Sequence, residues 1–220
     1  MHHRRHLQLI TEAKPLLTEE GFARVVLAMQ AGVDSVQVRE RGAPAQILLQ
    51  AAQRLLPPAS ETGTVVTIND RADIALALLP SRRATPGGYL VPVGVHLGGH
   101  SLPVSLVRRH LPLPLVGVSV HSLAEARSAA HDGADYLTFG HIFPSDSHPG
   151  LPPAGLGLLS EVVAAVDIPV LAIGGIDIDN VTDVLATSCD GIAVISAILN
   201  ASDPALAASQ LRAALDRVSP

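Results

Sequence analysis

The chain has 220 residues, a formal net charge of −5 and a mean hydropathy of +0.36. This length suits a single domain, because barrels commonly exceed 200 residues without dividing. The acidic charge balance and the 2% aromatic content disfavour nucleic acid as a partner, which would need a basic face and stacking side chains. No apolar run of about 18 residues predicts a membrane span, and the lone Cys189 excludes an intramolecular disulfide.

The opening stretch MHHRRHLQLI lacks the apolar core of a secretory signal, so we expect a cytoplasmic protein. Its cluster of His2, His3 and His6 has the spacing of a loose metal site, but cloning remnants look the same. The sequence leaves a monomer and a homodimer equally open.

Short β-rich runs alternate with helical stretches along the whole chain. The expected strands are LQLIT (7–11), SVQVRE (35–40), TVVTIND (64–70), VGVHLG (93–98), LVGVSV (115–120), YLTFGHI (136–142), PVLAIGG (169–175) and GIAVISAI (191–198). Most of them are apolar at successive positions, which is typical of strands covered on both faces. We therefore predict an α/β fold, a single (β/α)8 TIM barrel over residues 1–220. A doubly wound sheet is the alternative, because sequence does not show closure.

Six stretches between these runs have apolar residues near helical spacing. They are TEEGFARVVLAMQAG, APAQILLQAAQRLL, SLAEARSAAHDGA, LLSEVVAAV, DNVTDVLATS and DPALAASQLRAALDRV. One segment departs from the rhythm. SRRATPGGYLVPVG, residues 81–94, is rich in Gly and Pro and longer than most connections, so we predict an inserted surface loop.

Polar residues gather where the predicted strands end, which is where barrel enzymes carry their chemistry. These positions are Arg39, Arg41, Asn69, Asp70, His96, His100, Ser119, His121, His141, His148, Gly174, Gly175, Ile195 and Ser196. Gly174 and Gly175 follow the seventh strand, and Ile195 and Ser196 end the eighth, where barrels often bind phosphate through backbone N–H groups. An ordinary tight turn would need the same glycines.

Arg39 and Arg41 are two residues apart, so in an extended chain they point the same way. Together they would hold a carboxylate or a phosphate. The alternative is an ion pair with Glu40 or Glu12 at the rim.

Three of these histidines lie in or directly after a predicted strand. His121 follows the fifth strand and is placed to move protons near neutral pH. His141 and His96 lie inside strands, where a hydrogen-bonded core histidine is the commoner outcome. No HxH or HExxH spacing occurs on one element, so we predict no metal site.

The runs VQVRERG, TINDRADIAL, GVHLG, GVSVHSLAEA, GADYLTFGHIFPSDS, IPVLAIGGI and DGIAVISAI resemble the thiamine phosphate synthase and thiazole tautomerase (TenI) superfamily, in that order over nearly the whole chain. The resemblance implies a (β/α)8 barrel that acts in thiamine biosynthesis. The synthase joins a pyrimidine diphosphate to a thiazole phosphate and needs magnesium carboxylates and a cationic loop. The tautomerase converts a non-aromatic carboxythiazole phosphate to its aromatic isomer by moving a proton.

Several residues depart from the synthase pattern. Asp70 matches its first metal carboxylate, but Ser101 in GHSLP stands where QEDLP has an aspartate. In GHIFPSDSH, compared with GPIFPTxTK, His148 replaces the lysine, Asp146 adds a negative charge and His141 replaces the proline. A lost magnesium ligand and an added carboxylate weigh against the synthase, since both leave pyrophosphate charge less neutralised.

The motifs RER, SVHS and FGH resemble the tautomerase instead. We therefore predict a thiazole tautomerase, an isomerase with no cofactor and a phosphorylated thiazole as partner. A thiamine phosphate synthase requiring Mg²⁺ is the first alternative, and a non-catalytic sensor of a phosphate ligand is the second. The resemblance gives His121 the base and acid role, Arg39 the substrate carboxylate, Asn69 the ring or a water, and His141 the shape of the pocket.

Overall fold

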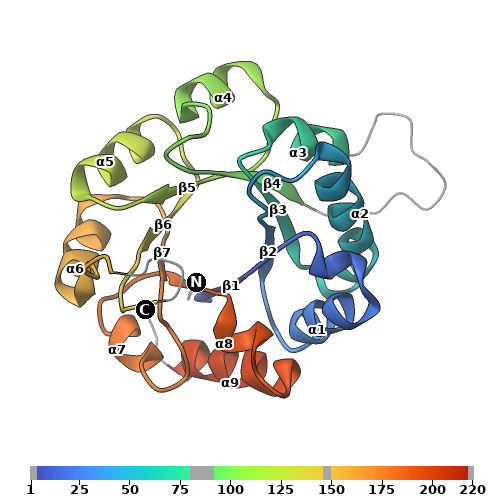
Figure 1. Cartoon of the computed structure of the whole chain (residues 1–220). Coiled ribbons are helices and arrows are strands. Elements are labelled where there is room, and N and C mark those ends of the chain that lie inside the picture. The colour runs from blue at the N-terminus through green and yellow to red at the C-terminus, as the bar shows by residue number, and fades with distance from the viewer. Residues whose placement is uncertain (1–3, 80–91, 146–149, 218–220) are drawn as a thin grey trace.

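The computed structural model describes residues 4–79, 92–145 and 150–217. Eight parallel strands close into a barrel in sequence order, and β1 pairs with both β2 and β8. The helices form a ring around these strands (Figure 1). The predicted single-domain (β/α)8 barrel is confirmed. Among the described residues, no helix is both long enough and apolar enough to cross a membrane.

Strands and helices alternate along the whole barrel. The strands are β1 (His6–Thr11), β2 (Ser35–Val38), β3 (Val65–Asn69), β4 (Val93–Leu97), β5 (Val116–Val120), β6 (Tyr136–Gly140), β7 (Val170–Ile173) and β8 (Gly191–Val194). The helices are η1 (Pro15–Leu17), α1 (Glu19–Gln30), α2 (Ala45–Thr62), α3 (Ala72–Leu78), α4 (Val104–His110), α5 (Leu123–His131), α6 (Gly155–Ala165), α7 (Val181–Leu185), α8 (Ser196–Leu199) and α9 (Pro204–Arg217). Every predicted strand run overlaps one of these strands.

The boundaries differ from the prediction in several places. The run 191–198 was expected to be all strand, but β8 ends at Val194 and α8 begins at Ser196. Helices α3 and α4 were not predicted, because each is only seven residues long and shows little helical periodicity. Helix α2 continues through Pro57 and Pro58, since its buried face packs on the barrel on both sides of them.

The structure describes only the last residues of the predicted insertion at residues 81–94. Residues 80–91 lie outside the described residues. Val93 and Gly94, at its end, already belong to β4.

The strands are not apolar on both faces. Gln8 on β1 donates a hydrogen bond to the hydroxyl of Tyr136 on β6, and these strands are not neighbours, so both side chains point to the barrel axis. Because facing alternates along a strand and is shared by paired residues, the register fixes the rest. The axis-facing set includes Gln8, Ser35, Gln37, Thr67, His96, Ser119, Tyr136 and Thr138. The prediction of strands apolar on both faces is wrong for the inner face.

The alternate residues face the helices and are apolar. They are Leu7, Leu9, Val36, Val38, Val66, Ile68, Val95, Leu97, Val118, Val120, Leu137 and Phe139, and all are buried. This shell between strands and helices is the hydrophobic core. Burial there stabilises the fold by about 1.5–3 kcal/mol for each large side chain, which leaves the interior of the barrel free to carry polar groups.

The Tyr136 ring occupies space that a glycine leaves open. A Cβ atom on Gly117, the neighbouring residue on β5, would lie 2.2 Å from the Tyr136 ring. The ring is buried, and its hydroxyl also bonds the His96 imidazole at 3.0 Å. Gly117 therefore allows Tyr136 to reach across the barrel.

Three aspartates accept hydrogen bonds at the end of the barrel where the strands begin. Asp34, Asp135 and Asp190 each immediately precede a strand. Their carboxylates accept the backbone N–H of Leu7, Val116 and Val170, in the same order, at 2.6–2.8 Å. Each aspartate thus pairs an N–H group at the start of the preceding strand.

We predict that Gly117→Ala destabilises the fold by about 1–3 kcal/mol, because the new methyl group overlaps the Tyr136 ring. Urea unfolding monitored by circular dichroism measures this. Gly157→Ala in α6 is the matched control, since nothing lies within 4 Å of its added Cβ. Equal stability of the two variants would show that Tyr136 is free to move.

Candidate active site

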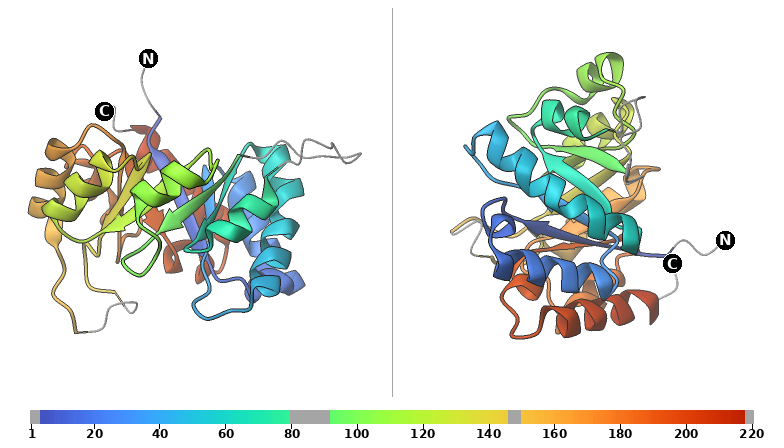
Figure 2. Two further views of the ribbon diagram at one scale, coloured as in Figure 1. Left: turned by 90° about the horizontal axis from the view of Figure 1, so that it is seen from above. Right: turned by 90° about the vertical axis from the view of Figure 1, so that its right-hand side faces the viewer.

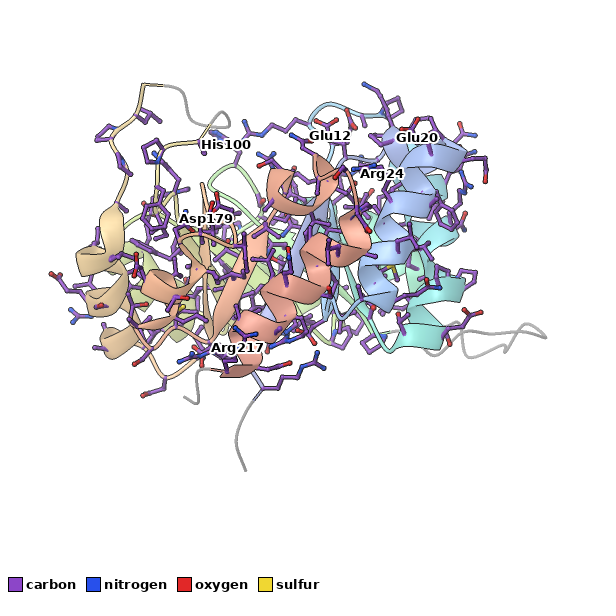
Figure 3. The ribbon with its side chains drawn as sticks, turned by 90° about the horizontal axis from the view of Figure 1, so that it is seen from below. Glu12, Glu20, Arg24, His100, Asp179 and Arg217 are labelled. Atoms are coloured by element: carbon purple, nitrogen blue, oxygen red, sulfur yellow. The ribbon has the colours of Figure 1, made fainter. Side chains whose placement is uncertain are left out.

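The carboxyl ends of the strands meet on one face of the barrel. Figure 3 shows Glu12, His100 and Asp179, which follow β1, β4 and β7, on this face, and Arg217 on the opposite face. The loop between β6 and α6 extends beyond the helices on the same side (Figure 2). Those polar residues singled out from the sequence that the structure describes lie at the strand ends around this mouth.

Asn69 and Asp70 stand where β3 meets β4. The Asn69 side-chain amide donates to the His96 carbonyl at 3.2 Å, and the Asp70 backbone N–H donates to the same oxygen at 2.8 Å. Asp70 has φ of 67° and is exposed. On the loop after β4, the Ser101 hydroxyl accepts the Gly98 N–H at 2.8 Å. One carboxylate and one hydroxyl therefore follow two adjacent strands.

His96 lies just beneath the mouth and is fully enclosed. Its Nδ1 atom is 3.0 Å from the Tyr136 hydroxyl, and its Nε2 atom is 2.9 Å from Ser119 Oγ and 3.2 Å from Thr138 Oγ1. Burial, together with the positive charge of nearby Arg39, lowers the pKa of His96 to about 3. His96 is thus a neutral hydrogen-bonding residue at physiological pH.

Arg39 projects from the end of β2 into the mouth and is partly buried. Burial and the neighbouring Arg41 lower its pKa, while Glu12 opposes the shift. The alternative of an ion pair between Arg39 and Glu40 is not found among the described residues, because Glu40 pairs with Lys14 at 3.2 Å. Arg39 still carries its charge, because a guanidinium does not deprotonate near neutral pH.

His121 is held by its backbone and by its ring. Its N–H donates to Glu125 Oε2 at 2.8 Å, and Ser122 caps α5 by accepting the Glu125 N–H. The ring Nδ1 atom lies 2.7 Å from the Gly140 carbonyl oxygen, which only accepts hydrogen bonds. Nδ1 must therefore carry a proton, and in the neutral imidazole Nε2 bears the lone pair.

His141 and the two glycines after β7 are packed against one another. A Cβ atom on Gly174 would lie 2.3 Å from the His141 Cβ, and one on Gly175 would lie 2.6 Å from the Pro144 carbonyl oxygen. Both glycines have positive φ, 101° and 65°. His141 is buried and its Nε2 atom lies 3.3 Å from the Leu151 carbonyl oxygen. The glycines thus allow the loop after β6 to rest on the end of β7.

The same turn presents backbone donors to the mouth. Within the described part of the chain, the N–H groups of Gly174, Gly175 and Ser196 donate to no protein acceptor. Successive N–H groups at positive φ form concavities that bind anions. Ile195 and Ser196 are exposed beside them at the end of β8.

Ser145 is not among the site residues predicted from the sequence. Its hydroxyl is buried and has no hydrogen-bond partner among the described residues. It stands where the synthase pattern GPIFPTxTK has its first threonine, which is the signal that identifies it. Asp146 and His148, predicted from the same motif, lie outside the described residues.

Comparison with known proteins decides the family. A family model described as thiamine monophosphate synthase (TMP-TENI) matches residues 7–198. The chain belongs to this family. A thiamine-phosphate synthase of Roseiflexus castenholzii is 38% identical over 84% of this chain and 76% of its own length. One of Pyrococcus horikoshii is 36% identical over 90% and 89%. The solved thiamine phosphate pyrophosphorylase from Pyrococcus furiosus superposes with a TM-score of 0.82, at 33% identity and 98% coverage of both chains.

These relatives correct the prediction of a thiazole tautomerase. Relatives that are 36–42% identical over most of this chain carry the name thiamine-phosphate synthase, a transferase and not an isomerase. The prediction of an isomerase is therefore wrong, and a closer relation to the tautomerase is not confirmed. Three short motifs and four departures from the synthase pattern led to that prediction, and similarity spread over the whole chain outweighs them.

We predict that the buried neutral His96 makes the fold lose stability in acid. Between pH 6.5 and about pH 3, the unfolded chain takes up a proton that folded His96 does not, so stability falls as pH falls. From pH 7 to pH 5 this amounts to about 2 kcal/mol. Urea unfolding at both pH values should show a drop that is smaller by that amount in His96→Gln. The same drop in both proteins would contradict the assignment.

Proposed function

We propose that this protein is a thiamine phosphate synthase, a transferase that joins a pyrimidine diphosphate to a thiazole phosphate with release of pyrophosphate. The observation that carries the proposal is the similarity to proteins named thiamine-phosphate synthase along nearly the full chain. The mouth of the barrel supports it, because one group of residues there suits a phosphate and a second group suits a diphosphate with its magnesium ion.

The first group consists of backbone N–H groups and suits the thiazole phosphate. The N–H groups of Gly174, Gly175 and Ser196 have no acceptor within the described chain and lie at the ends of β7 and β8. Barrels that bind phosphate commonly do so at this place. In this proposal, the backbone amides of these residues bind the thiazole phosphate, and Ile195 covers the bound phosphate.

The second group suits the diphosphate and its magnesium ion. Mg²⁺ is usually bound by one or two carboxylates together with substrate phosphates and water. The exposed Asp70 carboxylate and the Ser101 hydroxyl are hard oxygen donors on adjacent loops, so the donor set fits an ion that is held mainly by the substrate. The buried Ser145 hydroxyl is a further donor to phosphate oxygen.

The chain's own residues position the reactants and stabilise the departing charge. When bound, magnesium would neutralise charge on the leaving pyrophosphate. Arg39 adds a fixed positive charge inside the mouth, and Ser145 donates to the phosphate group. Asn69 and the Nε2 atom of His121 are the proposed contacts to the two rings.

We predict pyrophosphate release only when both phosphorylated substrates and Mg²⁺ are present. Asp70→Asn should lower kcat/KM by about 10- to 100-fold, because it removes the one carboxylate of the donor set. A coupled pyrophosphate assay measures this. Ser101→Asp is the matched variant, since an added carboxylate should lower the Mg²⁺ concentration needed for half-maximal rate. If the wild-type rate does not depend on Mg²⁺ concentration, Asp70 and Ser101 are not magnesium ligands.

We predict that His121→Ala lowers kcat/KM by about 10- to 100-fold, the loss expected for a contact of about 1.5–3 kcal/mol. The same assay at saturating Mg²⁺ measures it. His131→Ala is the control, because His131 is an exposed histidine at the end of α5. Equal activity of the two variants would remove His121 from the site.

A further inference from the structure

A second hollow lies at the opposite end of the barrel from the candidate active site. It has a volume of about 670 Å³ and is lined by residues at the starts of β1, β2, β3, β6 and β7. Its mouth is on the face where the strands begin, which carries Arg217 in Figure 3. The proposed reaction uses none of its lining residues, so a ligand bound in this hollow is independent of the proposed function.

The side walls of this hollow are apolar. Val163, Val166 and Ile168 line it from the end of α6 and the connection to β7. Val65 on β3 and Leu115 before β5 also line it. A site of this volume with apolar walls and a few polar groups is typical of small-molecule binding. Walls of this kind suit a flat ring system.

The closed end of the hollow is polar. Thr67 and Tyr136 line it there, and both side chains are buried. The Tyr136 hydroxyl is already bonded to Gln8 and His96. The Thr67 hydroxyl is completely buried and lies near the Tyr136 hydroxyl, but it forms no hydrogen bond of normal geometry with any described residue. An unpaired hydroxyl in this position costs about 1–3 kcal/mol, so it favours a ligand that brings a hydrogen-bonding atom to the inner end.

The mouth of the hollow favours an anion. Arg4 lines it, and the buried Arg5 lies beside it. Three carboxylates also line the hollow. Asp135 and Asp190 are engaged by the backbone N–H groups of the neighbouring strands, and Asp167 is exposed. Arg4 is 56% exposed, and its contacts with Asp34 and Asp216 are long, 3.5 and 3.7 Å. Such exposed ion pairs contribute little, so Arg4 is able to turn to a ligand.

We propose that this hollow binds a planar heteroaromatic carboxylate. The carboxylate lies at Arg4, the ring lies between the apolar walls, and a ring nitrogen accepts a hydrogen bond from Thr67. This is a ligand site separate from the mouth that holds the phosphorylated substrates.

Isothermal titration with three matched probes tests the proposal. Quinoline-6-carboxylate carries both the acid and the ring nitrogen, 2-naphthoate lacks the nitrogen, and quinoline-6-carboxamide lacks the charge. We expect saturable binding of the first, at least about 10-fold tighter than the amide and about 3-fold tighter than the naphthoate. Binding should persist with Mg²⁺ and pyrophosphate present in excess, because these occupy the other end of the barrel.

Matched variants locate the site. Arg4→Gln should weaken quinoline-6-carboxylate about 5- to 10-fold, whereas Arg217→Gln, an exposed arginine on the same face, should leave it unchanged. Thr67→Val should abolish the difference between the quinoline and naphthalene acids. Val163→Phe fills the hollow from its rim and should remove binding altogether. No saturable binding, a tighter amide, or an equal effect of Arg217→Gln would overturn the proposal.

Discussion

The hydrogen bonds of the Tyr136 hydroxyl hold three strands together across the barrel axis. Gln8 on β1 donates to it, and the His96 imidazole on β4 bonds it from the other side. Burial raises the pKa of Tyr136 to about 12, so the hydroxyl keeps its proton at neutral pH. Gly117 leaves the room that the ring needs. Polar groups therefore fill the axis, and the hydrophobic core lies outside the strands.

This arrangement separates the two ends of the barrel. Above Tyr136, His96 bonds Ser119 and Thr138, and these groups form the base of the candidate active site. Below it, Tyr136 and Thr67 close the second hollow. The side chains on the barrel axis are neutral, and charged residues lie at the two ends of the barrel. Arg39 and Asp70 lie at one end, and Arg4 and Arg5 lie at the other.

Much of the fold follows from sequence, because strand composition and spacing are local properties. All eight strand runs are found, and the residues at their ends gather at one mouth. The facing of Gln8, Thr67 and Tyr136 depends on barrel register, which no local pattern contains, and so the polar interior was missed. Helices α3 and α4 are too short for periodicity to reveal them.

The site was predicted in part. The glycines after β7 were expected as a phosphate turn, but their close contact with His141 and Pro144 is a tertiary feature of two loops. Arg39 was expected to bind an anion, with an ion pair to Glu12 or Glu40 as the alternative. Glu40 pairs with Lys14, and Glu12 acts on Arg39 through its charge. The tautomerase prediction failed because it weighed Ser101, His141 and His148 as losses. One carboxylate with hydroxyl donors is enough for a magnesium ion that the substrate largely holds.

We propose that one end of the barrel binds the pyrimidine diphosphate and the thiazole phosphate together and that they are joined there. Mass spectrometry of the mixture of protein, Mg²⁺, pyrimidine diphosphate and thiazole phosphate tests it most directly. We expect a new ion whose mass equals the summed masses of the two substrates minus that of pyrophosphate, and it should form only when both substrates are present. Recovery of both substrates unchanged after many hours with folded protein would contradict it.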